Sequence, residues 1–271
     1  MDKPLVSVIM GIYNTAESLP QSIQSILDQT YTNWELIMCD DCSTDNTYEV
    51  AVAYAEKYPN IKVIRNEQNM RLAYSLNHCL KYVQGEYVAR MDADDICLPE
   101  RFEKQVEFLN MHKEYMVVGS TLIPYDESGE RLPRMIKEYP SARDMKCGVT
   151  FFHPTIMMRK EGYEQLQGYY VSKRTRKGQD LDLWFRFYEK GFKGYNIQEP
   201  LLKYHESFDD YKKKRNISYS WGMCKTALHG FRINRFPFYL YLWAFKDLVS
   251  ALVPRWLRFR RHSKATKGGK E

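Results

Sequence analysis

Short apolar runs alternate with amphipathic stretches along the first half of the chain. The runs are rich in β-branched residues, as is typical of strands buried on both faces. They lie at residues 5–10 (LVSVIM), 34–39 (WELIMC), 61–65 (IKVIR) and 86–91 (EYVARM). Between them, apolar residues recur at helical spacing after residue 19, through residues 50–54 and over residues 72–83. These repeated units predict an α/β fold with a mostly parallel, doubly wound sheet.

Polar residues and a proline indicate where the helices should begin. Asn14 with Glu17 resembles a capping box for the first helix, and Ser43 or Asp45 suits the cap of the second. Pro99 suits the first turn of a helix after the fourth strand. We therefore expect a helix to follow each of the four strands, and the one after the third strand should span residues 72–83.

Acidic clusters follow two of the predicted strands. The segment CDDCS ends the second strand, and DADD, with Asp92, Asp94 and Asp95, ends the fourth. Since parallel sheets bind ligands at the carboxyl ends of their strands, both clusters should face one crevice. Neighbouring carboxylates repel one another unless a cation or a hydrogen-bonding ligand lies between them.

A hard divalent cation is the natural counter-charge for such a cluster. Mg²⁺ or Mn²⁺ held by one or two protein carboxylates keeps coordination positions for phosphate oxygens. In an extended segment Asp92 and Asp94 share one side of the chain, whereas Asp95 points away unless the chain turns. The alternative, in which loop aspartates cap the next helix, suits one of the three residues. The pattern therefore predicts a nucleotide bound through metal and carboxylates.

Composition and local motifs narrow the class of protein. At 271 residues and 44% hydrophobic content, the chain suits one sizeable α/β domain or two small ones. The loop after the first strand, GIYNTAES, carries neither the glycine pattern of dinucleotide-binding oxidoreductases nor that of P-loop hydrolases. The N-terminal stretch MDKPLVSVIMGIYN lacks the features of a secretory signal, so we expect a cytoplasmic protein.

The cysteines are scattered through patterned segments, which favours free thiols and a reducing compartment. They are Cys39, Cys42, Cys79, Cys97, Cys147 and Cys224. The first two form a C-x-x-C, but no second pair follows at zinc-finger spacing. A pair of small core residues is the favoured interpretation.

Five segments, taken in order, resemble the family 2 glycosyltransferases of GT-A fold. They are VSVIMGIYN, ELIMCDDCSTDNT, NMRLAYSLNHCL, GEYVARMDADDICLPERF and GQDLDLW. The resemblance implies a Rossmann-like, mostly parallel sheet flanked by helices over residues 1–215. Residues 1–112 would form the nucleotide-sugar-binding half and residues 113–215 the acceptor-binding half, with a helical extension over residues 216–271.

The resemblance also implies which residues bind the nucleotide sugar: Gly11, Tyr13, Asn14, Asp40, Arg71, Asp92 and Asp94. Asp40 would contact the base, usually uracil. Asp92 would contact the ribose or support the site indirectly, and Asp94 would hold the metal, with Asp95 as a second ligand. Arg71 would lie near the nucleotide or diphosphate; a surface arginine is the alternative.

The catalytic base implied by the resemblance is Asp180, in a position that opens a helix. Gln179 stands where the family usually has glutamate, and Asp182 is the alternative base. His205 would reach the metal or diphosphate. His153 would shape the acceptor pocket, with a structural histidine as the alternative.

The implied reaction is inverting transfer of one sugar per encounter, because the chain lacks the Gln-x-x-Arg-Trp motif of processive members. The expected donor is a UDP-sugar and the expected acceptor a glycan or a lipid-linked glycan, as in bacterial surface-polysaccharide biosynthesis. Two alternatives stay open: a non-catalytic sugar-nucleotide or glycan-binding module, and a nucleotidyltransferase.

The C-terminal segment combines aromatic and basic residues. Phe238, Leu242, Phe245, Val249 and Leu252 recur at helical spacing, and RFRRHSKATKGGK follows them. Much of the net charge of +6 lies here and in KKKR at residues 212–215. We expect no nucleic-acid partner. We predict instead an interfacial helix on anionic lipid, which would place the enzyme on the inner face of the cell membrane; packing on the core is the alternative.

Overall fold

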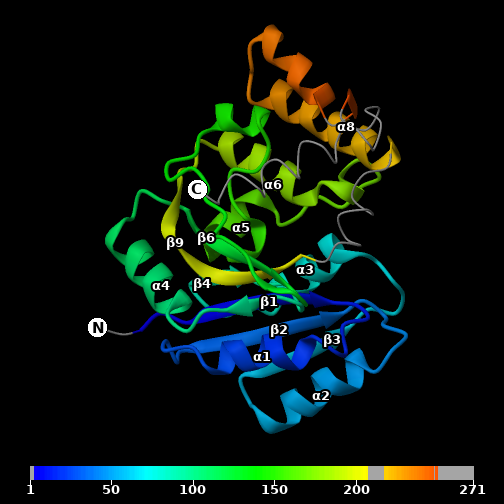
Figure 1. Cartoon of the computed structure of the whole chain (residues 1–271), viewed down its shortest axis with the longest axis vertical. Coiled ribbons are helices and arrows are strands. Elements are labelled where there is room, and N and C mark those ends of the chain that lie inside the picture. Colours follow the sequence, from blue (N-terminus) through cyan, green and yellow to red (C-terminus); the bar gives the residue numbers. More distant parts are fainter. Residues whose placement is uncertain (1–2, 207–216, 247, 250–271) are drawn as a thin grey trace.

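The computed structural model describes residues 3–206, 217–246 and 248–249 (Figure 1). The strands are β1 (Val6–Ile12), β2 (Trp34–Asp40), β3 (Ile61–Arg65), β4 (Tyr87–Arg90), β5 (Ile96–Cys97), β6 (Val117–Asp126), β7 (Gly129–Glu130), β8 (Met157–Arg159) and β9 (Gly194–His205). The α-helices are α1 (Leu19–Leu27), α2 (Thr47–Lys57), α3 (Leu72–Leu80), α4 (Arg101–Met111), α5 (Lys160–Leu166), α6 (Gln179–Glu189) and α8 (Ile217–Ile233). The 3₁₀ helices are η1 (Ala142–Lys146), η2 (His153–Thr155), η3 (Thr175–Lys177) and η4 (Phe238–Phe245).

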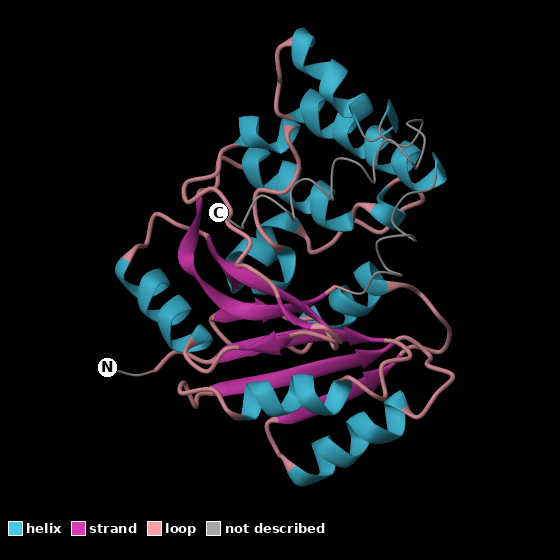
Figure 2. Ribbon diagram, viewed as in Figure 1, coloured by secondary structure: helices cyan, strands magenta, loops and turns pink. Residues whose placement is uncertain are grey.

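One continuous sheet runs through the molecule in the order β3-β2-β1-β4-β8-β6-β9-β5, with β7 beside β6 (Figure 2). β3, β2, β1 and β4 are mutually parallel, as the βα units predict. Beyond β4 the sheet is mixed, since β8 runs antiparallel to both β4 and β6 whereas β9 is parallel to β6. The α/β fold is confirmed, and the parallel arrangement belongs mainly to the first half.

The two faces of the sheet are covered by different helices. On β1, Val8 and Met10 pack in one core together with residues of α1, α2 and α4, whereas Ile9 packs in the other with α3, α5 and α6. This alternation is the two-residue period of a strand buried on both faces. The carboxyl ends of β1, β2 and β4 therefore meet at one edge between two helical layers.

Three predicted helix starts are wrong. Asn14 does not cap α1, whose N-cap is Ser18; instead Asn14 has φ 51° and its side-chain oxygen accepts a hydrogen bond from the Thr44 N–H at 2.9 Å. Pro99 precedes the cap of α4, Glu100, rather than lying in the first turn. The N-cap of α2 is Asn46 and neither Ser43 nor Asp45, although Asp45 does accept the Thr47 N–H at 3.0 Å.

The C-terminal segment differs from the single amphipathic helix that we predicted. α8 precedes it, and the chain turns at Arg235, where φ is 52°, before η4 begins. The residues of η4 that reach the core are Leu240 and Ala244. The predicted apolar face is instead exposed at Phe238 (87%) and Leu242 (76%), and also at Phe245 and Val249; Leu252 lies outside the described residues.

None of the described helices combines the length and the apolar character that a membrane span requires. All six cysteines are free thiols. Cys39 is buried at the end of β2 and Cys42 is partly exposed in the loop beyond it. The C-x-x-C is therefore not a disulfide, and the interpretation as two small core residues is confirmed for Cys39 but not for Cys42.

Candidate functional site

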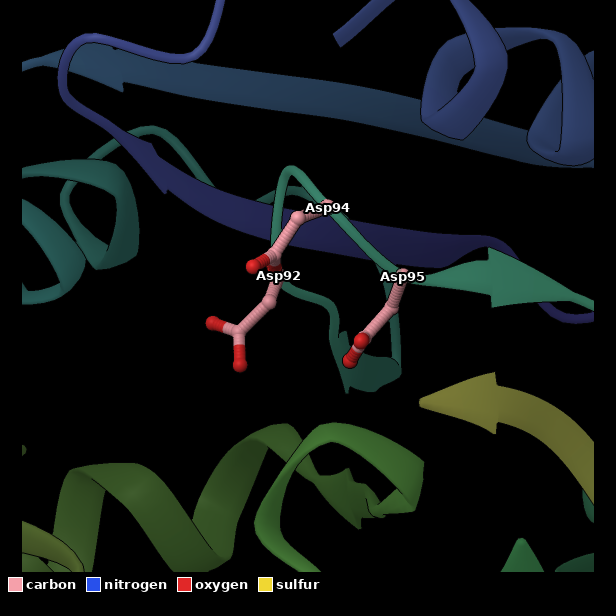
Figure 3. Close-up of side chains that lie close together, drawn as sticks. All are labelled: Asp92, Asp94 and Asp95. Atoms are coloured by element: carbon pink, nitrogen blue, oxygen red, sulfur yellow. The ribbon is translucent and has the colours of Figure 1, made fainter. Parts of the chain in front are cut away.

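The acidic segment after β4 forms a tight turn that brings three carboxylates together (Figure 3). The Asp95 N–H donates to the carbonyl of Asp92 at 3.3 Å, so the chain reverses after Ala93. All three side chains project to the same side of the turn, and one oxygen from each lies within 4.8 Å of the others. Because the chain turns, Asp95 joins Asp92 and Asp94 instead of pointing away.

Asp95 is the most enclosed member of this cluster. It is fully buried; its Oδ1 accepts the backbone N–H of His205 at 3.0 Å, and its Oδ2 has no hydrogen-bond partner. Burial, and then the negative charges of Asp92 and Asp94, hold the pKa of Asp95 well above its usual range. A buried carboxylate oxygen without a partner is what a bound cation would satisfy, so the residues fit a divalent metal.

His205 lies beside the cluster, and its predicted contact with a metal or diphosphate stays a prediction. Its Nδ1 is 3.8 Å from Oδ2 of Asp94, and its ring packs on Tyr125. The Tyr125 hydroxyl donates to the Asp94 carbonyl at 2.8 Å. Burial raises the pKa of Asp94, and the charge of Asp92 adds to this effect. The structure thus brings Asp92, Asp94, Asp95 and His205 together.

Arg90 is a site residue that the sequence reasoning missed. It is buried in β4 and forms an ion pair with Asp92. The sequence did contain a signal for this residue, since Arg90 lies in an apolar strand two residues before an aspartate. A buried guanidinium needs a carboxylate partner. This ion pair fixes Asp92 at the side of the cluster, while Asp94 stays more open to a ligand.

The loops after β1 and β2 lie beside one another. Asp40 is fully buried and pairs with Nε of Arg65 at 3.0 Å, a second arginine that we did not foresee. Tyr13 is exposed, and Gly11 packs on α3 so closely that a Cβ there would lie 2.8 Å from Cδ1 of Leu72. Base binding by Asp40 stays a prediction; its observed partners are Arg65 and the N–H of Ser43.

Asp41 determines the position of Arg71. Its carboxylate accepts the backbone N–H groups of Met70 at 2.8 Å and Arg71 at 2.6 Å. Arg71 has φ 76°, an unfavourable conformation for a residue with a side chain, and it serves as the N-cap of α3. Its side chain is exposed and lines a cavity. Contact with a nucleotide or diphosphate stays a prediction.

That cavity, of about 570 Å³, also contains Asp180. It is lined by Met70, Arg71, Leu72, Ala73, Val171, Ser172, Lys173, Thr175, Arg176, Lys177, Gln179, Asp180 and Tyr219. Asp180 lies in the first turn of α6, and burial raises the pKa of its carboxyl group. The charges of Arg90 and Asp92 also affect this pKa, which places Asp180 within electrostatic reach of the acidic turn.

The alternative base, Asp182, and the predicted acceptor-side residue, His153, are less accessible. Asp182 is buried and pairs with Arg174 at 2.7 Å and Arg186 at 2.8 Å, so it serves the fold. His153 is buried, and its Nε2 lies 2.8 Å from the Tyr169 hydroxyl. Burial lowers the pKa of His153 well below its usual range, so the ring is neutral. A structural role accounts for these contacts, and an acceptor contact by His153 stays a prediction.

Comparisons of the sequence agree on one family. A family model described as glycosyl transferase family 2 matches residues 7–167. The chain is 46% identical over 269 residues to the putative glycosyltransferase EpsE of Bacillus subtilis, covering 99% of this chain and 96% of that one. It is 32% identical to the putative teichuronic acid biosynthesis glycosyltransferase TuaG of the same organism, covering 93% and 98%.

A shorter match, 40% identical over 109 residues, is to WfgD of Escherichia coli, a UDP-Glc:α-D-GlcNAc-diphosphoundecaprenol β-1,3-glucosyltransferase. It covers 40% of this chain and 42% of that one.

Solved structures share the fold. Residues 1–349 of S. aureus TarS in complex with UDP-GlcNAc superpose with a TM-score of 0.69 at 18% identity, covering 92% of this chain and 81% of that one. The mannosyltransferase PcManGT of Pyrobaculum calidifontis, in complex with GDP-Man and Mn²⁺, gives 0.65 at 20% identity, covering 100% and 77%. The arrangement of sheet and helices is therefore that of known glycosyltransferase structures.

Proposed function

The chain belongs to glycosyltransferase family 2, and on that premise we propose that it transfers a sugar from a UDP-sugar to a glycan or lipid-linked acceptor, with inversion, in cell-surface polysaccharide biosynthesis. The observation that carries the proposal is the placement of two acidic centres at one edge of the sheet. The turn at Asp92, Asp94 and Asp95 suits a diphosphate with its cation, and Asp180 lies in the adjacent cavity. The names of TuaG and WfgD support the class of product and acceptor.

Each centre has a separate part in the reaction. Asp180 would accept the proton of the acceptor hydroxyl as that oxygen attacks the anomeric carbon from the face opposite the nucleotide. Its raised pKa makes the carboxylate a stronger base than an ordinary aspartate. Asp94 and Asp95 would hold Mg²⁺ or Mn²⁺, which offsets negative charge on the departing diphosphate. Arg90 keeps Asp92 in place beside them.

A screen of nucleotides tests the donor half of the proposal. We expect UDP and UDP-sugars to raise the melting temperature only when Mn²⁺ or Mg²⁺ is present, because ligands that bind the native state stabilise it. Asp94→Ala should abolish this stabilisation, whereas Asp28→Ala, at an exposed aspartate of α1's C-cap, should retain it. Metal-independent binding, or binding that survives Asp94→Ala, would contradict the assignment.

We also propose that η4 and the residues after it contact an anionic membrane. Phe238, Tyr239 and Leu242 are exposed on η4, and the sequence that follows from residue 255 to 270 is strongly basic. Exposed aromatic residues beside cationic ones suit the headgroup region of anionic lipid. The exposed surface of η4 thus supports the predicted location on the inner face of the cell membrane.

Liposome flotation measures this contact. The triple variant Phe238→Ser, Tyr239→Ser and Leu242→Ser should lose binding to phosphatidylglycerol vesicles. A control with Leu132→Ser and Met135→Ser, at exposed apolar residues elsewhere, should bind like the wild type. Equal flotation of all three proteins would refute the membrane proposal.

A further inference from the structure

The cavity beside Asp180 has an unusual charge balance. Among its described lining residues are four cations, Arg71, Lys173, Arg176 and Lys177, and a single carboxylate, that of Asp180. A base that must take a proton from a neutral sugar hydroxyl does not require four cations around it. The excess positive charge therefore indicates that something anionic enters the cavity.

The cations have no partners of opposite charge in the part of the chain that the structure describes. The neighbouring Arg174 forms an ion pair with Asp182, with 2.7 Å between its Nη2 and Oδ1 of the carboxylate. In contrast, Lys173, Arg176 and Lys177 form no ion pair with any described carboxylate. All three side chains are exposed, so their charges are available to a ligand. In contrast to Arg174, they do not serve the packing of α6.

Two helix N-termini add to the positive potential. α3 begins at Leu72 after its N-cap Arg71, and α6 begins at Gln179; all three residues line the cavity. The first N–H groups of a helix lack partners within the helix and favour anions. At α6, the N–H of Leu181 already donates to Oδ1 of Asp180 at 2.8 Å. Together with the three cations that form no ion pair within the described residues, the two helix N-termini make the cavity suited to a phosphate.

The diphosphate of the donor would account for Arg71 but not for Lys173, Arg176 and Lys177. Its proposed place is the turn at Asp92, Asp94 and Asp95, and none of these three lines the cavity. Lys173, Arg176 and Lys177 come from the segment around η3, in the predicted acceptor-binding half, and share the cavity with Asp180. A molecule that presents its hydroxyl to Asp180 would bring its own anionic group to these cations.

The cavity wall also offers apolar surface. Val171 and Tyr219 line it, and the turn of α8 that contains Tyr219 exposes Ile217 and Trp221 to solvent. α8 in turn packs against η4, where Phe238 and Leu242 are exposed. Exposed apolar side chains are thus present both on α8, next to the cavity, and on η4, at the surface that we assign to the membrane.

We propose that Lys173, Arg176 and Lys177 form a subsite for the diphosphate that joins the acceptor sugar to a lipid. This inference deepens the proposed function and rests on it for the role of Asp180. The sugar hydroxyl would face Asp180, the diphosphate would accept hydrogen bonds from the cations, and the lipid would leave along α8. The cavity volume, about 570 Å³, falls in the range usual for small-molecule sites.

Calorimetric titration with farnesyl diphosphate in metal-free buffer tests the subsite without any sugar transfer. The variant Lys173→Gln/Arg176→Gln/Lys177→Gln should bind farnesyl diphosphate at least about tenfold more weakly than the wild type. The matched control Lys81→Gln/Lys113→Gln/Lys190→Gln removes the same number of charges at exposed positions outside the cavity and should bind normally. Equal affinity of both triple variants would overturn the proposal.

Two further measurements separate this subsite from the donor site. Asp94→Ala should still bind farnesyl diphosphate, and the cavity variant should still bind UDP with Mn²⁺. If the cavity variant loses UDP binding as well, the cations serve the donor and the inference is wrong. Inorganic pyrophosphate should bind more weakly than farnesyl diphosphate; equal affinity would overturn the lipid-linked part. If the wild type does not bind UDP, the proposed function is contradicted, whereas the subsite for the lipid diphosphate is not.

Discussion

Asp180 and Asp182 are two residues apart on α6, but their surroundings differ. Asp180 lines the cavity, and no described cation pairs with its carboxylate. Asp182 points into the protein and is held between Arg174 and Arg186. The 100° turn between successive residues of a helix accounts for this separation. One carboxylate is thus available for chemistry, and the other stabilises the loop that precedes the helix.

Exchanging each of these carboxylates for an amide should separate catalysis from stability. Asp182→Asn leaves two arginines without a counter-charge and should lower the free energy of unfolding by about 2 to 4 kcal/mol. Asp180→Asn should change it by less than about 1 kcal/mol. Urea denaturation monitored by tryptophan fluorescence measures both values. Similar losses in the two variants would contradict the assignment of separate roles.

The pH dependence of transfer should report the environment of Asp180. Burial raises its pKa, so the folded protein keeps the proton to higher pH than an ordinary aspartate, whose pKa is about 3.9. A base must be deprotonated, and activity should therefore fall as the pH decreases through this raised value. The acid limb of kcat/KM for the acceptor measures it. An acid limb whose apparent pKa lies at or below the ordinary value for aspartate would exclude Asp180 as the titrating base.

For single residues, the sequence predicted which side chains belong to the candidate site better than it predicted their contacts. Asp94 and Asp95 were identifiable because three aspartates after an apolar strand require a reason. The turn that brings Asp95 to the cluster depends on one backbone hydrogen bond, which alternation within a strand does not predict. Arg90 and Arg65 were missed because each pairs with an aspartate through the tertiary fold.

At the scale of elements, α8 completes the cavity by packing on α6 and η3. Gly230 lies so close to α6 that a Cβ there would overlap the ring of Phe185. Gly222, on the same helix, would place a Cβ 3.9 Å from Cβ of Lys177, an ordinary contact. The close approach of the two helices thus depends on the first glycine and not on the second.

These two glycines give a matched pair of substitutions. Gly230→Ala should destabilise the protein by about 1 to 3 kcal/mol, because α8 must move away from Phe185. Gly222→Ala should instead stabilise it by up to about 1 kcal/mol, because alanine favours the helix and meets no obstruction. Thermal unfolding of both variants checks the signs. A stabilising Gly230→Ala would show that α8 does not pack on α6 as described.

The elements of the first half were predictable, and those of the C-terminal segment were not. β1 to β4 lie within two residues of the apolar runs, since burial on both faces leaves a continuous signal. The cap at Asn14 failed because its side chain bonds across to the loop after β2. The apolar helical face that we predicted through Phe238 and Leu242 is not buried. The chain turns at Arg235, and it is Leu240 and Ala244 of η4 that reach the core.

For the whole molecule, one fold brings the acidic turn and Asp180 within electrostatic reach of each other. The acidic turn follows β4 in the parallel half of the sheet, and Asp180 lies in the first turn of α6. α8 and η4 lie at the opposite end of the molecule from α1 and α2 (Figure 1). A lipid-linked acceptor could therefore approach from the α8 side while the nucleotide occupies the loops after β1 and β2.

The most direct test of this account combines donor turnover with donor binding in Asp180→Asn. With the UDP-sugar found by the screen and the native acceptor, turnover should fall by about 10²- to 10⁴-fold, because the general base is lost. The dissociation constant for UDP with Mn²⁺ should stay within about twofold of the wild type. Undiminished turnover, or loss of UDP binding together with turnover, would contradict Asp180 as the base of a metal-dependent glycosyltransferase.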